Sequence, residues 1–151
     1  MRCFRIGDSR FPLFDPTGAR MHGGRWNSPG QSVIYAAETY AGAILEILVH
    51  TNLSRLPRTH ASISIEIPDD LAMERIETHQ VSGWDAPDQI VSRAFGDRWI
   101  QEKRTAVFLV PALVTRGHER NVLLNPSHPA FSRIQHSGPE PVIFDERLFT
   151  R

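Results

Sequence analysis

Cysteine is almost absent from this chain, since Cys3 is the single one among 151 residues. One thiol cannot form an internal disulfide or a cysteine metal cluster, so a reducing, cytoplasmic compartment is the simplest expectation. No secretory signal is expected either, because the first ten residues, MRCFRIGDSR, contain no apolar stretch. No apolar run approaches the length that a transmembrane helix needs, so we expect no membrane partner.

An excess of charge of either sign is also absent. Lys and Arg total 17, Asp and Glu total 17, and the net charge is zero with histidine neutral. Proteins dedicated to nucleic acid usually carry a basic excess or stripe, so no direct nucleic-acid partner is expected, although local basic patches remain open. The histidines show no metal-ligand spacing, so no metal is expected. Those considered are His22, His50, His118 and His128.

The remaining composition is that of an ordinary globular protein, with 40% hydrophobic residues. The length predicts one domain over residues 1–151, large enough to bury a real core. Many short strands with helices inserted at two places, 38–50 and 85–104, predict an α+β fold with a curved or split β-sheet. The expected strands are 3–6, 32–36, 61–67, 105–111, 121–125 and short segments at 134 and 142–145.

Two further regions have a defined expectation. Residues 7–22 are interpreted as a loop, since Gly, Pro and Asp recur along them. The helical region 85–104 is expected to bend or split at Gly96, because glycine weakens a helix interior. Trp99 and Ile100 are expected core contacts.

The most informative stretch is 23–50, which predicts a turn, a strand and a helix. Gly23 and Gly24 permit backbone conformations closed to other residues and allow close approach to a ligand. Ser28-Pro29-Gly30 is typical of a turn. The apolar, β-branched segment 32–36 then predicts a buried strand.

The helix expected over 38–50 has one unusual face. Its core face is predicted to be Ala41, Ile44, Leu45, Leu48 and Val49. Glu46 stands on the opposite, small and apolar face with Gly42, Ala43, Ile47 and His50, so the helix is expected to be covered nearly all round. A carboxylate away from water needs partners or a function. The alternative is a surface glutamate beside a histidine four residues later.

Seven stretches carry a family resemblance when they are taken in order: Phe4-Arg5, GRWN (24–27), VIYAAE (33–38), ILEILVH (44–50), FLVP (108–111), NVLLNPSHPAF (121–131) and FDERLF (144–149). Together they resemble the RES-domain family of bacterial toxins, named for an Arg–Glu–Ser trio and paired with Xre-like antitoxins. The resemblance runs nearly from end to end of the chain.

The resemblance implies a fold related to ADP-ribosyltransferase toxins and an enzyme with NAD as substrate. It implies cleavage of the nicotinamide–ribose bond by phosphorolysis, with inorganic phosphate as co-substrate, or by hydrolysis. The alternative is transfer of ADP-ribose to a host-cell protein. From other classes, an RNA-targeting toxin and an inactive NAD-binding module stay open. The implied partner is an Xre-like antitoxin that blocks the active site.

The resemblance also implies which residues act. Glu46 would stabilise positive charge on the ribose, Arg25 would hold pyrophosphate or incoming phosphate, and Tyr35 would stack on the nicotinamide ring. The implied NAD-binding positions are Arg5, Gly24, Trp26, Asn27, Ala112 and Asn125.

Position 112 departs from the family pattern. The family serine should follow Val110 and Pro111, and Ala112 stands there instead. Three explanations stay open: the hydroxyl is dispensable, the activity is reduced, or the chain is an inactivated form.

Each assigned residue also has an ordinary structural interpretation. Arg25 could pack on its tryptophan neighbour at the surface. Tyr35 could be a common strand tyrosine, and Arg5 could pair with a nearby acid such as Asp8. Asn121 and Asn125 could satisfy the backbone of a turn.

Overall fold

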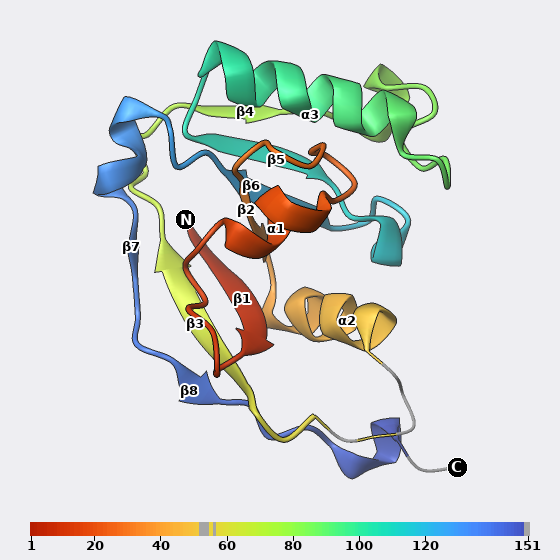
Figure 1. Cartoon of the computed structure of the whole chain (residues 1–151), viewed down its shortest axis with the longest axis vertical. Coiled ribbons are helices and arrows are strands. Elements are labelled where there is room, and N and C mark those ends of the chain that lie inside the picture. Colours follow the sequence, from red (N-terminus) through yellow and green to blue (C-terminus); the bar gives the residue numbers. More distant parts are fainter. Residues whose placement is uncertain (52–54, 56, 150–151) are drawn as a thin grey trace.

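A computed structural model describes residues 1–51, 55 and 57–149 (Figure 1). Its strands form one mixed sheet in the order β4-β5-β6-β2-β1-β3-β7, with β8 paired to β3. The pair β4·β5 is parallel and the other pairs are antiparallel. The strands are β1 Arg2–Asp8, β2 Ile34–Ala37, β3 His60–Glu66, β4 Met73–Arg75, β5 Val107–Pro111, β6 Arg120–Leu124, β7 Gln135–His136 and β8 Glu140–Pro141.

The sheet is nearly split between β1 and β2. These strands share a single register pair, Phe4↔Ala37, whereas β1 and β3 are paired along their whole length. In Figure 1, β1 and β3 run steeply across the direction of β4 and β5. The expected α+β fold is therefore confirmed, and the sheet, predicted to be curved or split, is a single open sheet that is nearly split.

Arg5 spans this split with its side chain. Its Nη1 donates to the Tyr35 carbonyl oxygen of β2 at 2.7 Å, and its Nε donates to the Leu13 carbonyl oxygen at 2.6 Å. Burial lowers the pKa of Arg5 from its ordinary value, and the nearby Asp15 opposes the shift. The guanidinium thus satisfies one carbonyl of β2 beside the split and one of the loop that follows β1.

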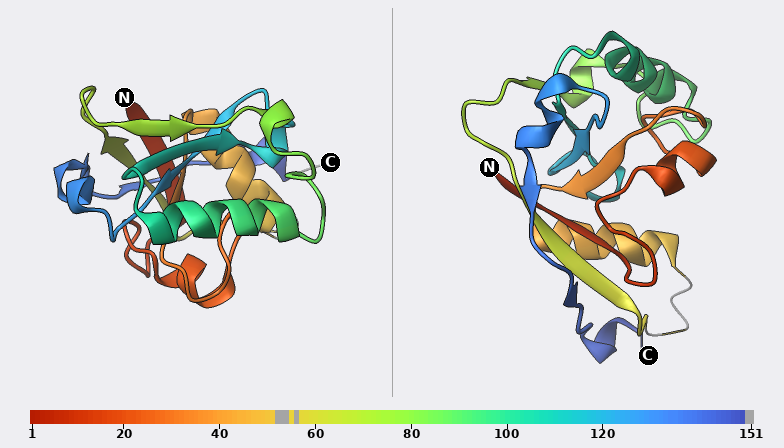
Figure 2. Two further views of the ribbon diagram at one scale, coloured as in Figure 1. Left: turned by 90° about the horizontal axis from the view of Figure 1, so that it is seen from above. Right: turned by 60° about the vertical axis from the view of Figure 1, so that its left-hand side comes forward.

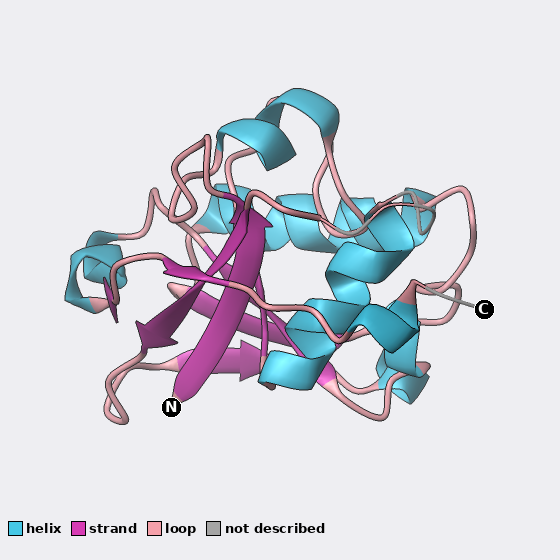
Figure 3. Cartoon of the chain, turned by 90° about the horizontal axis from the view of Figure 1, so that it is seen from below, coloured by secondary structure: helices cyan, strands magenta, loops and turns pink. Residues whose placement is uncertain are grey.

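The helices are α1 Thr17–His22, α2 Tyr40–His50 and α3 Ile90–Glu102, with short 3-10 turns at Thr78–Gln80, Leu113–Thr115, Pro129–Arg133 and Glu146–Leu148. Figure 2 shows α3 lying along the β5 end of the sheet, while α2 lies against β1. In Figure 3 most of the helical ribbon lies to one side of the strands. None of the helices in the described ranges is long and apolar enough to span a bilayer.

An aromatic core holds α3 against the sheet. Trp99 and Phe108 are fully buried with ring centroids 5.1 Å apart, and Trp26 meets Phe108 edge-on at 6.3 Å. Such pairs add to the stability that apolar burial provides. The expected core positions Trp99 and Ile100 are both buried.

Several local predictions were wrong. Residues 17–22 form α1, although 7–22 was expected to be a loop throughout. Position 134 and residues 142–145 lie outside the strands, although both were expected to be strands; β7 and β8 lie just beside them. Helix α3 begins at Ile90 and continues through Gly96 without a break. A Cβ at Gly96 would lie 1.8 Å from the Trp26 carbonyl oxygen. This glycine therefore permits close packing of α3 on the loop at Trp26.

The orientation of α2 also differs from the prediction. Gly42 and Ala43 are buried, whereas Leu45 and Val49 of the expected core face are 39% and 60% exposed. A Cβ at Gly42 would lie 3.5 Å from the Ala37 Cβ, so the small residues let the helix approach β2 closely. The face that carries Glu46 consequently points inward, and the helix is not covered all round.

Candidate functional site

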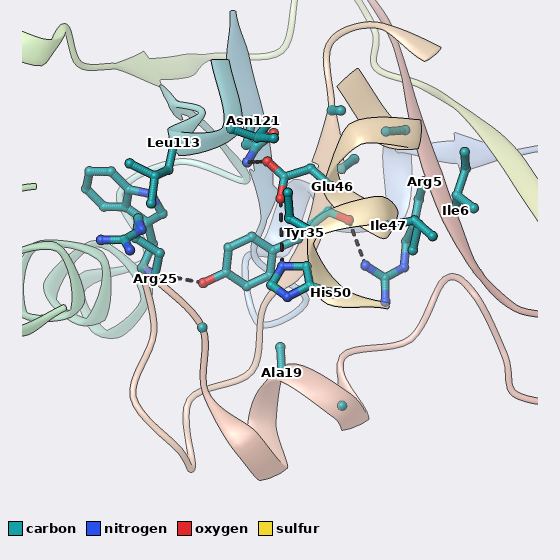
Figure 4. A pocket seen from close by; sticks show the side chains of 18 of the residues that line it. Arg5, Ile6, Ala19, Arg25, Tyr35, Glu46, Ile47, His50, Leu113 and Asn121 are labelled. Carbon is teal, nitrogen blue, oxygen red and sulfur yellow. Dashed lines mark hydrogen bonds and ion pairs between the residues drawn. The ribbon is translucent and has the colours of Figure 1, made fainter. Parts of the chain in front are cut away.

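A cavity of about 740 Å³ opens where the sheet is nearly split (Figure 4). Its volume falls within the ~300–1,000 Å³ that is typical of small-molecule sites. Strands β1 and β2, helix α2, the loop at 23–26, the start of α3 and the segment after β5 surround it. Its polar lining consists of Arg5, Arg25, Tyr35, Glu46, His50, Gln89, Arg93 and Asn121.

Glu46 projects from α2 into this cavity, and its side chain is 29% exposed. Its Oε1 accepts a hydrogen bond of 2.9 Å from Nδ2 of Asn121 on β6. Its Oε2 lies 3.8 Å from Nε2 of His50, whose side chain is 75% exposed. One carboxylate oxygen is therefore held by a neutral donor, while the other faces an exposed imidazole.

Tyr35 lies beside Glu46 in Figure 4, but its hydroxyl is already engaged. The hydroxyl donates to Oδ1 of Asn27 at 2.7 Å and accepts from the Trp26 backbone N–H at 3.0 Å. Burial raises the pKa of Tyr35 well above its ordinary value, outweighing the Trp26 hydrogen bond and the nearby arginines. The phenol thus stays protonated, and the ring is the part of Tyr35 that can meet a ligand.

The two glycines at the cavity edge are required by their neighbours. A Cβ at Gly24 would lie 2.7 Å from the Tyr35 hydroxyl oxygen. Gly23 has φ +73°, and a Cβ there would lie 3.0 Å from Nη2 of Arg93 and 2.9 Å from the Pro29 ring. The backbone of Gly23 and Gly24 was expected to approach a ligand closely; in the structure it closely approaches protein side chains instead.

Arg25 is held by backbone carbonyls. Its Nη1 donates to the carbonyl oxygens of Trp84 and Ala86, both at 3.0 Å. Burial lowers the pKa of Arg25, and the nearby Asp85 acts in the opposite direction. Figure 4 places Arg25 and Arg5 on opposite sides of Tyr35 and Glu46.

The cavity lining is more basic than the chain as a whole. It contains three arginines, Arg5, Arg25 and Arg93, and one carboxylate, Glu46. Within the described ranges, no carboxylate lies within ion-pair distance of any of these guanidinium groups. Cationic groups without acidic partners favour an anionic ligand.

The nine residues expected at the site divide into two groups. Six of them line this cavity together, although they come from β1, β2, α2 and the loop between α1 and β2. They are Arg5, Gly24, Arg25, Trp26, Tyr35 and Glu46. The other three, Asn27, Ala112 and Asn125, are buried and are not among the lining residues.

These three residues have structural contacts instead. Asn27 accepts from the Tyr35 hydroxyl, and its Nδ2 donates to the Ala19 carbonyl oxygen at 2.8 Å. Asn125 donates to the Ile100 carbonyl oxygen at 3.1 Å and accepts from the Ser127 backbone N–H at 3.0 Å.

Ala112 is 3% exposed and lies between two cavity residues. Its backbone N–H donates to the Glu119 carbonyl oxygen at 3.0 Å. Pro111 and Leu113 on either side line the cavity.

Sequence reasoning assigned no site role to four polar cavity residues, His50, Gln89, Arg93 and Asn121. Arg93 stands in a helix that begins later than expected, so its direction could not be inferred. Asn121 begins a motif of the resemblance, but it was interpreted only as a residue that satisfies turn backbone. Its contact with Glu46 crosses 75 positions and depends on the packing of β6 beside β2.

No group of three or more His, Cys, Asp or Glu side chains in the described part of the chain could hold a metal ion. The arrangement offers one positioned carboxylate, an aromatic ring and several guanidinium groups. Such a site can bind a phosphate-bearing ligand and stabilise positive charge beside it.

Known proteins resemble this chain in sequence and in fold. The model of the RES domain matches residues 2–145. The chain belongs to the RES-domain family. This chain is 39% identical over 138 residues to the Prs ADP-ribosylating toxin of Sphingobium sp. (strain YBL2). The matched region covers 89% of this chain and 85% of the relative. This chain is also 33% identical over 137 residues to the toxin Res of Photorhabdus laumondii. That match covers 88% of this chain and 86% of the relative.

A solved structure shows the same fold at lower identity. In the MbcT–MbcA toxin–antitoxin complex of M. tuberculosis, a chain matches the RES domain with a TM-score of 0.72 at 20% identity. The match covers 93% of this chain and 83% of the other.

Proposed function

We propose that this RES domain is the toxin of a toxin–antitoxin system and consumes NAD by cleaving its nicotinamide–ribose bond. One observation carries the proposal: Glu46, oriented by Asn121, shares a cavity with the Tyr35 ring and with guanidinium groups that form no ion pair with any carboxylate of the described residues. The name of the Sphingobium relative, an ADP-ribosylating toxin, supports NAD as the substrate class.

The chemistry suits these residue types. Nicotinamide leaves with the electron pair of the broken C–N bond and becomes neutral, so its departure needs no strong acid. The ribose carbon becomes positively charged in the transition state. A preoriented carboxylate stabilises such charge where it develops, and Glu46 takes this role.

The other cavity residues bind the substrate. The Tyr35 ring stacks on the nicotinamide, because aromatic faces pack well on flat heterocycles. Arg25 binds a phosphate group through the N–H donors that Trp84 and Ala86 leave available.

The acceptor that we propose first is inorganic phosphate. An oxygen of the phosphate bonds to the ribose carbon as nicotinamide leaves, which produces ADP-ribose 1″-phosphate. Water can replace phosphate in the same step. The name of the Sphingobium relative favours a second candidate, transfer of ADP-ribose to a protein side chain.

The proposed partner is an Xre-like antitoxin that covers the cavity. The structural neighbour is a toxin chain from a toxin–antitoxin complex, which supports a partner of this class. Any contact with DNA would then be made through the antitoxin.

The deciding experiment measures NAD loss with and without phosphate. The wild-type chain is expected to consume NAD, and Glu46→Gln is expected to lower the rate by ~10²–10³, as the loss of one transition-state contact does. Glu140→Gln, a change at an exposed glutamate of β8, is the matched control and should keep the wild-type rate.

Products distinguish the acceptors. Phosphate-dependent formation of ADP-ribose 1″-phosphate supports phosphorolysis, and a labelled protein band from labelled NAD in lysate supports transfer. NAD that stays intact in all arms while added RNA is degraded would overturn the proposal.

A further inference from the structure

We propose that Arg93 and Arg25 together form a subsite for a phosphate oxyanion at one wall of the cavity. This inference rests on the proposed use of NAD and adds a residue that neither the sequence motifs nor the family comparison assigns. Arg93 lies on the first turn of α3, far in sequence from Arg25, and both residues line the cavity.

Neutral acceptors orient both guanidinium groups. Nε of Arg93 donates to the Gly24 carbonyl oxygen at 2.8 Å, and Nη1 of Arg25 donates to the Trp84 and Ala86 carbonyl oxygens. A carbonyl fixes the direction of a guanidinium without neutralising its charge. Both positive charges therefore stay available to a ligand.

The local backbone makes room for this arrangement. Gly24, the acceptor for Arg93, directly precedes Arg25, so one short loop links the two side chains. A Cβ at Gly23 would lie 3.0 Å from Nη2 of Arg93. The terminal nitrogens of Arg93 therefore lie against position 23, where a side chain would crowd them.

Two like charges that line one cavity favour an anion between or beside them. Burial is the main cause that lowers the pKa of Arg25; Asp85 and Glu46 oppose it, and repulsion by Arg93 adds to it. Within the described ranges, the acid on the next turn of α3, Asp97, binds Ser28 through both carboxylate oxygens. The planar guanidinium group of arginine can donate two parallel N–H hydrogen bonds to two oxygens of one phosphate. Two such guanidinium groups therefore suit a phosphate group well.

The oxyanion has two possible sources with the same chemistry. One is the diphosphate that joins the two nucleosides of NAD, and the other is free inorganic phosphate that attacks the ribose. Binding measurements with separate probes distinguish them, and either source satisfies the proposed subsite.

The test measures affinity by calorimetry in a Glu46→Gln background, in which turnover does not consume a ligand. The probes are sodium phosphate, ADP-ribose and, as the probe without phosphate, adenosine. Arg93→Gln is expected to weaken binding of at least one phosphate-bearing probe roughly 10- to 100-fold, the usual effect of losing a charged hydrogen bond. Arg98→Gln, on the exposed side of the same helix, is the matched control and should change nothing.

A second measurement covers the case in which Arg93→Gln fails to fold. Phenylglyoxal modifies exposed guanidinium groups, and mass spectrometry locates the modified arginines in the unaltered chain. Phosphate or ADP-ribose should protect Arg93 and Arg25, and neither should protect Arg98.

The outcomes separate the two proposals. Weaker binding in Arg93→Gln supports the subsite even if the wild-type chain leaves NAD intact, and only the proposed function would then fail. Equal affinities of Arg93→Gln and its parent for both phosphate-bearing probes, or no protection of Arg93, would overturn the subsite while leaving NAD cleavage open.

Discussion

The side-chain amide of Asn121 donates a 2.9 Å hydrogen bond to Oε1 of Glu46 and so connects strand β6 to helix α2. Asn121 pairs with Ala37 at the end of β2 and with Val110 of β5, so its backbone is held on both sides. The donor therefore stands on a rigid strand, and it orients the carboxylate on the helix. This relationship motivates the first prediction.

Replacing Asn121 with alanine should lower kcat more than it changes KM for NAD. The carboxylate would remain but lose its orienting donor, and we expect a decrease of roughly 10-fold, the effect of about 1.4 kcal/mol. Steady-state NAD consumption measures both constants.

Asn121→Asp distinguishes a role in orienting Glu46 from a purely structural role of Asn121. At high pH two ionised carboxylates repel each other, whereas at lower pH the pair holds one proton and can restore the hydrogen bond. The ratio of variant to wild-type kcat should therefore rise from pH 8 to pH 5.5. A ratio that stays constant with pH would contradict the orienting role.

Tyr35→Phe should cost stability more than substrate affinity. The variant keeps the ring but leaves the Asn27 oxygen and the Trp26 N–H without their partner, which costs about 1–3 kcal/mol. Urea unfolding measures the loss, and KM for NAD should stay within severalfold of the wild-type value. Tyr35→Leu, which removes the ring, should raise KM; an unchanged KM would argue against stacking.

Gly96→Ala should destabilise the fold strongly. The added methyl would lie 1.8 Å from the Trp26 carbonyl oxygen, a backbone atom that cannot move alone, so α3 must shift. We expect a loss of at least ~2 kcal/mol, as in other overpacked cores. Gly18→Ala in α1, where nothing lies within 4 Å of the new Cβ, is the control and should be neutral or slightly stabilising by thermal unfolding.

Ala112→Ser should change the rate of NAD consumption by less than about threefold, which is under 1 kcal/mol of barrier. The position is buried and is not among the residues that line the cavity, so a hydroxyl there would meet protein groups. Side-by-side assays of the two chains provide the measurement. A rise of tenfold or more would instead show that alanine disables the enzyme.

Cys3 should make stability depend on pH in the alkaline range. Burial raises the pKa of its thiol from 9.0 to about 12; the N-terminal amine opposes this shift, and Glu66 adds to it. The folded state thus holds the proton more tightly than the unfolded state, so this stabilisation is complete below pH 9 and is lost as pH rises toward 12. Unfolding free energies of the wild type and Cys3→Ala should converge across that window, and parallel curves would contradict the linkage.

The amino-acid sequence alone determined the local elements and the main chemical candidates. Alternation and β-branching located the principal strands, and the order of Arg25, Tyr35 and Glu46 within short motifs indicated a family whose membership is now established. These features are local, because strand periodicity and motif spacing depend on residues that are neighbours in the chain.

Only the tertiary structure decided which face of α2 points inward and which distant groups meet Glu46. The apolar residues of α2 favoured burial of Leu45 and Val49, but the small residues Gly42 and Ala43 fit closely against the sheet and turned the helix the other way. The placement of Asn121 beside Glu46 and of Arg93 beside Arg25 depends on contacts across many positions. Packing sets such contacts, and neither periodicity nor composition records them.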